Sequence, residues 1–180
     1  MTQRIIILLL LVICRLDVTA QELITTQKIT KDSISIKWLP LNFDQYKMIA
    51  LNGAKVSRLV SSKKESYFNL NFGNAKTWVI TPTKDRFDKL NDDIPNQQKQ
   101  KALIESVYTN NLEQELIDFA FSSALSENVV NPNFQFVLGN ILVDKTFNKK
   151  ETYVYKIEVK GFEDTYVFIN PKVLTSYPSI

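Results

Sequence analysis

The 180-residue chain contains no histidine, one cysteine and only four glycines. Without histidine it lacks the commonest general base and the commonest metal ligand of proteins. The four glycines lie too far apart to form a loop that cradles a phosphate group. These absences argue against a histidine-based active site, a metal centre and a nucleotide-binding loop. We therefore expect no enzyme activity and predict no catalytic residue, no metal ligand and no cofactor.

The net charge is small, at +3, and lysines are interspersed with acidic residues. The short basic runs Lys63-Lys64 and Lys149-Lys150 are typical of a solvated surface. A nucleic-acid-binding protein presents a clustered basic stripe, so nucleic acid is not an expected partner. Hydrophobic residues make up 44% of the chain, and eleven Phe, seven Tyr and two Trp supply enough bulk for the core of one domain.

The first twenty residues have the three-part pattern of a secretory signal peptide. A charged start precedes an apolar run over residues 5–14, and Ala20 ends a segment that suits cleavage before Gln21. The run is too short to span a membrane, and Ile13 stands where a lipoprotein signal acylated at Cys14 has a small residue. We expect an exported protein, secreted, periplasmic or at the cell surface. Its lack of disulfides after cleavage suits a bacterial protein.

Several later segments alternate apolar and polar residues with the period of two that is typical of half-buried β-strands. The clearest covers residues 152–159, whose alternation places Tyr153, Tyr155 and Ile157 on one face. We expect this strand to be the centre of the fold. Further strands are expected at residues 33–38, 54–60, 65–72, 77–81, 141–146 and 165–169, with a candidate edge strand within residues 21–31 and a connecting segment at residues 42–50.

Between residues 84 and 139 the apolar period becomes helical. The spacing of Asn111 and Gln114 matches a helix-capping pair. Pro132 and Gly139 stand where proline and glycine begin and end a short helix. One helical stripe is expected to consist of Leu112, Leu116, Phe119 and Ala120.

Three of these segments resemble, in their order, a fibronectin type III domain. They are the early strand with Trp38, the strand over residues 54–60, and the late strand with Tyr153, Tyr155 and Ile157. In that family a tryptophan of the second strand packs in the core, which implies the same for Trp38. A tyrosine that opens the sixth strand forms the tyrosine corner; Tyr155 matches it best, and Tyr153 is the second candidate.

The long helical segment is a departure from an ordinary domain of this family, which has roughly a hundred residues. It resembles a fibronectin-III-like domain at the start of large secreted proteins of Bacteroidetes-type bacteria. There the helical insertion also ends in Leu-Gly before a Val-Asp strand, as Leu138-Gly139 and Val143-Asp144 do here.

This resemblance covers about residues 24–170 and implies a mainly β fold. The expected fold is a fibronectin-III/immunoglobulin-like β-sandwich with two to three additional helices. The expected division is a signal peptide at residues 1–20, a sandwich at 21–170 with the helical insertion at about 84–139, and a linker or tail at 171–180.

Two functions fit these expectations. The first is a non-enzymatic structural or adhesive module, the N-terminal domain of a larger secreted protein, with a protein or glycan partner. The second is a glycan-binding or carbohydrate-active protein that uses aromatic residues and the acidic residues of the helical insertion. Its candidate ligand-binding residues are Trp78, Tyr67 and Tyr108, and Tyr46 is a further aromatic outside the expected strands.

Other chemical interpretations of the sequence are weaker. Glu115 and Asp118 lie on one helical face with Glu113 nearby, and a solvated surface explains them better than a glycosidase pair does. Asp92-Asp93 lacks the alternating oxygen ligands of a calcium loop. Residues 61–64, Ser-Ser-Lys-Lys, fit a polar turn better than a serine nucleophile with a lysine base.

Overall fold

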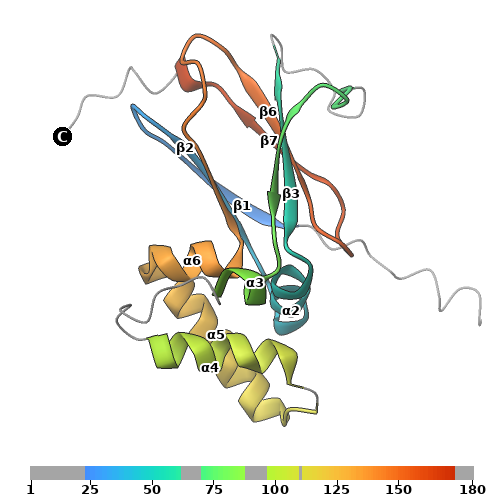
Figure 1. The fold of residues 1–180 in the computed structure, drawn as a ribbon, viewed down its shortest axis with the longest axis vertical. Helices are drawn as coiled ribbons and strands as arrows, with labels where there is room; N and C mark the ends of the chain where they lie inside the picture. The colour runs from blue at the N-terminus through green and yellow to red at the C-terminus, as the bar shows by residue number, and fades with distance from the viewer. Residues whose placement is uncertain (1–22, 62–69, 88–96, 110, 173–180) are drawn as a thin grey trace, which may run out of the picture.

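The computed structural model of the protein describes residues 23–61, 70–87, 97–109 and 111–172. The strands form the upper half of the molecule and the helices gather in the lower half (Figure 1). The fold is mixed, with two antiparallel sheets and a group of helices. The expected signal peptide lies outside the described residues, as do residues 173–180 of the expected tail. In the described ranges, no helix has the length and apolar character needed to cross a membrane.

All strand pairs are antiparallel. The first sheet has the order β1-β2-β5, with β1 at Ile24–Ile29, β2 at Ile34–Leu39 and β5 at Ile141–Asp144. The second has the order β4-β3-β6-β7, with β4 at Lys76–Ile80, β3 at Ala54–Val60, β6 at Tyr153–Glu158 and β7 at Thr165–Ile169. The expected strand over residues 65–72 lies mostly outside the described residues, and residues 70–72 are not in a strand.

The helices are more numerous than the sequence led us to expect. They are α2 at Phe43–Asn52, α3 at Thr83–Phe87, α4 at Gln97–Tyr108, α5 at Gln114–Val130 and α6 at Pro132–Leu138. The segment expected to be a simple connection is α2. The Asn42 side chain caps this helix by accepting a hydrogen bond from the Gln45 backbone at 2.9 Å. Gly53 ends it with a φ of 68°, in the left-handed region that favours glycine.

Within the helical segment, one boundary is as predicted and one is not. Helix α6 starts at Pro132 and ends before Gly139, whose φ is 79°. The predicted capping pair is wrong, because α5 begins at Gln114 with Glu113 as its N-cap residue, and no side chain caps it. The predicted apolar stripe is buried at Ala120, but its larger side chains on α5 are exposed. Leu116 is 52% and Phe119 is 70% exposed.

The hydrophobic core between the two sheets, the upper core, contains the largest side chains. Trp38, Tyr153, Tyr155 and Ile157, the positions expected to be structural, are at most 1% exposed there. The alternation of β2 and β6 places these side chains on the inward faces.

A second cluster of buried residues, the lower core, lies among the helices. It includes Leu103, Val107, Ala124 and Phe134 from α4, α5 and α6. Helix α2 joins the two cores, because Ile49 packs in the upper core while its neighbour Ala50 belongs to the lower one.

Candidate functional site

Two oppositely charged residues occupy inward positions on facing sheets. Along β3 the alternation that buries Ala54 and Val56 brings Arg58 to the same face two residues later. Along β5 the same alternation places Asp144 two residues after the buried Leu142, and Asp144 is only 1% exposed. The two sheets therefore bring a cation and a carboxylate together at the edge of the upper core.

The Asp144 carboxylate is bonded on both of its oxygens. Arg58 Nη1 lies 2.5 Å and the Tyr155 hydroxyl lies 2.8 Å from Oδ2. The backbone N–H and the hydroxyl of Thr146 donate to Oδ1 at 2.7 and 2.8 Å. We call these four residues the inter-sheet clasp, because Asp144 belongs to the first sheet while Arg58 and Tyr155 belong to the second.

The electrostatics of the clasp favour its charged form. Burial alone would raise the pKa of Asp144, but the hydrogen bonds from Thr146 and Tyr155 and the charge of Arg58 hold that pKa below its usual value. Burial acts to lower the pKa of Arg58, and the charge and hydrogen bond of Asp144 raise it above its usual value. Burial and the bond to Asp144 raise the pKa of Tyr155. At neutral pH the clasp therefore holds a carboxylate, a guanidinium and a neutral phenol.

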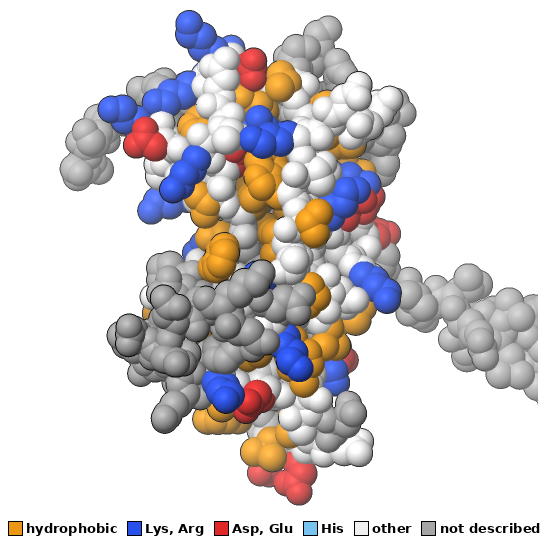
Figure 2. Space-filling view, in the orientation of Figure 1, with side chains coloured by type: hydrophobic (Ala, Val, Ile, Leu, Met, Phe, Trp, Pro, Cys, Tyr) orange, Lys and Arg blue, Asp and Glu red, His pale blue; other side chains and the backbone are white. Residues whose placement is uncertain are grey.

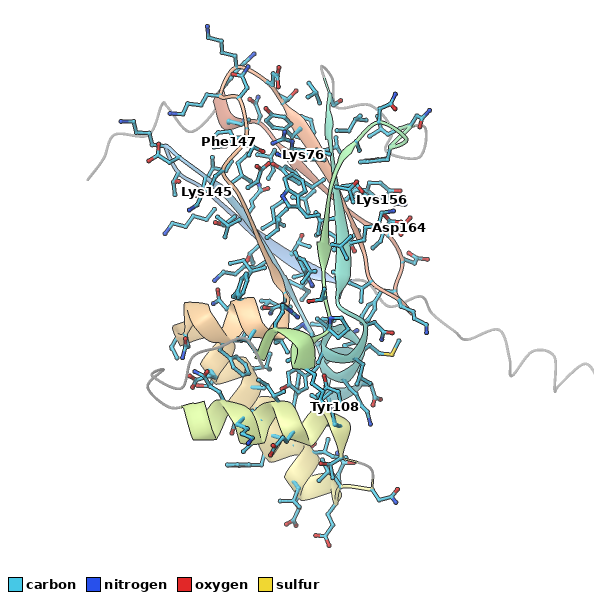
Figure 3. All side chains as sticks on the ribbon, viewed as in Figure 1. Lys76, Tyr108, Lys145, Phe147, Lys156 and Asp164 are labelled. Atoms are coloured by element: carbon cyan, nitrogen blue, oxygen red, sulfur yellow. The ribbon has the colours of Figure 1, made fainter. Side chains whose placement is uncertain are left out.

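Aromatic rings enclose the cationic side of the clasp. The Arg58 guanidinium carbon lies 4.7 Å from the ring centre of Tyr153 and 5.6 Å from that of Trp78. Lys76 lies opposite Arg58 in the β3–β4 register, with its ammonium 5.2 Å from the Trp78 ring centre and 2.5 Å from the Thr146 hydroxyl. Figure 3 places Lys76 in the sheet half, and Figure 2 shows basic side chains among hydrophobic ones there.

The aromatic residues expected to bind a ligand differ in how many protein contacts they make. The Trp78 ring packs on the upper core and stacks on Tyr155 with centroids 6.4 Å apart, besides its contacts with Arg58 and Lys76. Its ring is therefore part of the surroundings of the clasp, and it is half-buried. Tyr67 lies outside the described residues.

Two further tyrosines form hydrogen bonds within the helical half. Tyr108 is 38% exposed, and its hydroxyl accepts a hydrogen bond from the Lys84 backbone at 3.1 Å. Tyr46, the further aromatic outside the expected strands, is not available at the surface to bind a ligand. It is 1% exposed in the lower core, where its hydroxyl donates to the Leu103 carbonyl at 2.9 Å.

The two tyrosines of β6, both candidates for a tyrosine corner, make different hydrogen bonds. The hydroxyl of Tyr153 accepts from the Asn148 backbone N–H at 2.6 Å and lies 3.2 Å from the Asn148 carbonyl, to which it can donate. A bond back to the backbone a few residues upstream is the mark of a tyrosine corner. Tyr155, the preferred candidate, donates instead to the Asp144 side chain.

The acidic residues considered for a glycosidase pair are exposed where the structure describes them. Asp118 accepts a bond from Gln114 at 2.8 Å, and both are exposed. Glu113 and Glu115 are exposed as well. Asp92-Asp93 and residues 62–64 lie outside the described residues. Among the residues that are described, no three acidic, histidine or cysteine side chains are grouped to hold a metal ion.

A second polar region is a pocket of about 280 Å³ between α2 and α5. One wall is formed by residues 41–44, the chain entering α2, and the other by four residues of α5. The α5 residues that line it are Gln114, Ile117, Asp118 and Phe121.

The clasp was missed in the sequence, although a signal for it exists. Arg58 and Asp144 each continue the inward side of a strand after apolar residues, so each charge falls where the alternation demands burial. A buried charge is costly unless it is paired, and the two charges are opposite. Strand pairing across 86 residues of sequence is needed to bring them together.

No family model, no curated protein and no solved structure matches this chain. The chain is therefore classified by its architecture alone, as a mixed fold of two antiparallel sheets accompanied by helices.

Proposed function

We propose that the protein is an exported, non-enzymatic binding or structural module with a fibronectin-III-like sandwich, at the start of a larger secreted protein. The strand pairing supports the sandwich. Strands β1, β2 and β5 share one sheet and β4, β3, β6 and β7 the other. This division resembles that of immunoglobulin-like folds, in which strands A, B and E lie in one sheet and C, F and G in the other. The bond of Tyr153 to the backbone of Asn148 supports it as well.

One observation carries the non-enzymatic part of the proposal. The buried carboxylate of Asp144 receives four hydrogen bonds from Arg58, Tyr155 and Thr146. A general acid or base needs a position from which it can exchange a proton with a substrate, whereas this carboxylate faces protein donors on both oxygens. Its arrangement suits the joining of two sheets.

The proposal predicts no turnover. Purified protein incubated with panels of polysaccharides and peptides, with and without a metal chelator, should release no products detectable by chromatography and mass spectrometry. Hydrolysis that copurifies with the protein and disappears in Asp118→Asn or Glu115→Gln would contradict it. Export is tested separately by sequencing the N-terminus of the secreted protein, which should begin at Gln21.

The second candidate function is glycan binding, and the pocket between α2 and α5 favours it. The pocket combines phenylalanine rings with amide and carboxylate side chains, and one of its carboxylates, Asp118, belongs to the helical insertion. The partner of the module would then be a saccharide, bound without chemistry.

A further inference from the structure

The lining of the pocket between α2 and α5 follows from helix periodicity. Gln114, Ile117, Asp118 and Phe121 are spaced by three, four and seven from the first, so they form one stripe along α5. The opposite wall is the short segment at residues 41–44, which enters α2. The pocket thus lies between two helices that Figure 1 shows in the lower half.

The apolar part of this lining is held in place by the lower core. Phe43 and Phe121 are partly buried and pack against that core. The Phe43 ring also contacts Tyr46, with centroids 5.9 Å apart. Because Tyr46 is itself fixed by its bond to Leu103, the Phe43 ring has a firm support. Leu41 and Ile117 complete the apolar surface.

The polar part offers both donors and acceptors. Asn42 uses its side-chain oxygen to cap α2, which leaves its amide N–H groups as donors. Gln114 donates to one oxygen of Asp118 at 2.8 Å, so the other Asp118 oxygen and the Gln114 oxygen are acceptors. The Asp44 carboxylate bonds to no described residue. No lysine or arginine lines the pocket.

We infer that this pocket binds one ring of a neutral saccharide. A pyranose ring combines an apolar C–H face, which suits Phe43 and Phe121, with hydroxyl groups that both donate and accept. At about 280 Å³, the pocket lies just below the usual range of ligand-site sizes, roughly 300–1,000 Å³, which suits one ring. This inference rests on the second candidate function and names its ligand class and site, whereas the proposed module function remains valid if the pocket binds nothing.

Three other ligand classes fit less well. An acidic sugar would meet the carboxylates of Asp44 and Asp118 without a compensating cation. A purely apolar ligand would remove water from these carboxylates and give them no hydrogen bond in return. An organic cation would satisfy the carboxylates but not the amide donors of Asn42, which need an acceptor on the ligand.

The direct test is saturation-transfer NMR on the purified protein. The panel contains methyl glucoside, methyl galactoside, methyl mannoside and N-acetylglucosamine, with glucuronic acid, cyclohexanol and N-acetyl-lysine amide as the competing classes. We expect at least one neutral saccharide to give a concentration-dependent signal above those three. No signal from any neutral saccharide, or tighter binding of glucuronic acid, cyclohexanol or the lysine derivative, would overturn the inference.

Matched variants locate the binding. Asp118→Asn keeps the shape of the side chain but removes its charge and replaces one acceptor oxygen with an N–H donor. We expect roughly tenfold weaker binding, because the ligand loses a charge-assisted hydrogen bond. Phe121→Ala should weaken binding by a similar or larger factor. Glu115→Gln is the control, since Glu115 lies on α5 but does not line the pocket. Thermal unfolding checks that each variant is folded. If folded Asp118→Asn and Phe121→Ala proteins both bind as the wild type does, the site is not this pocket.

Discussion

In the sheet half of the molecule, the ionised side chains nearest the core are bonded to one another. Arg58, Asp144 and Tyr155 join two sheets with distances of 2.5 and 2.8 Å. In the helical half, the pocket between α2 and α5 presents Asp44 and Asp118 to solvent, each with at least one carboxylate oxygen without a bond to any described residue. The same residue type thus stabilises the fold in one half and remains accessible to a ligand in the other.

Both halves contain buried polar groups that have no hydrogen-bond partner among the described residues. In the upper core one of them is the indole nitrogen of Trp38. Among the helices the Asn128 side chain is buried, and neither its nitrogen nor its oxygen has a partner in the described part of the chain. Gln100 is fully buried and bonds Glu127 through its nitrogen at 3.3 Å, while its oxygen has no described partner. Unsatisfied buried groups cost stability, so both halves carry such a cost.

The largest effect is expected in the upper core. Trp38 is fully buried between the sheets, so Trp38→Ala should lower the free energy of unfolding by about 3–5 kcal/mol. Chemical denaturation followed by circular dichroism measures this loss. The control is Val79→Ala, because Val79 is 74% exposed on β4, and its effect should stay within about 0.5 kcal/mol. Equal effects of the two substitutions would contradict the assignment of the core.

A smaller effect separates the two tyrosines of β6. Tyr155→Phe removes a bond to the buried Asp144 carboxylate and should cost about 2 kcal/mol. Tyr153→Phe removes bonds to the Asn148 backbone and to the half-buried Glu151 carboxylate, and it should cost about 1 kcal/mol. Urea denaturation of both variants compares them directly. If Tyr155→Phe leaves the free energy of unfolding unchanged while Tyr153→Phe lowers it, the bond of Tyr155 to Asp144 stabilises the fold less than the bonds of Tyr153 do.

Acid should weaken the clasp through the lowered pKa of Asp144. Since the folded-state pKa lies below the unfolded value of about 3.9, this contribution is fully present above about pH 5 and is lost as the pH falls through the unfolded pKa toward the folded one. Each unit of lowering corresponds to about 1.4 kcal/mol. Unfolding free energies of the wild type and Asp144→Asn, measured between pH 3 and pH 7, should converge at the acid end. A constant difference across this range would argue against the lowered pKa.

Much of the sheet half could be predicted from the sequence, because alternation is a local signal. The inward positions of Trp38, Tyr153 and Ile157 follow from the alternation of apolar and polar residues along each strand. Helix α2 was missed, although Asn42 and Gly53 are ordinary signals for the ends of a helix. The apolar residues of α2 pack in two different cores, so they do not form the single apolar stripe that marks a helix in the sequence.

The candidate sites were less predictable, because both depend on contacts between distant segments. Arg58 and Asp144 meet only after β3 and β5 have been placed in opposite sheets. The pocket requires α5 to lie against the start of α2, and the helical period of α5 alone suggested Leu116 and Phe119 as its buried face, which are exposed. Local periodicity predicts a stripe but not which neighbour covers it.

The most direct test of the difference between the two halves compares one isosteric substitution in each, Asp144→Asn and Asp118→Asn, by urea denaturation at pH 7. Asp144→Asn leaves the mostly buried Arg58 without its counter-charge and should lower the free energy of unfolding by about 3 kcal/mol. Asp118→Asn should change it by less than about 0.5 kcal/mol, because Asp118 is exposed at the pocket rim. Similar losses in both variants would contradict the assignment of Asp144 to the fold and of Asp118 to the ligand pocket.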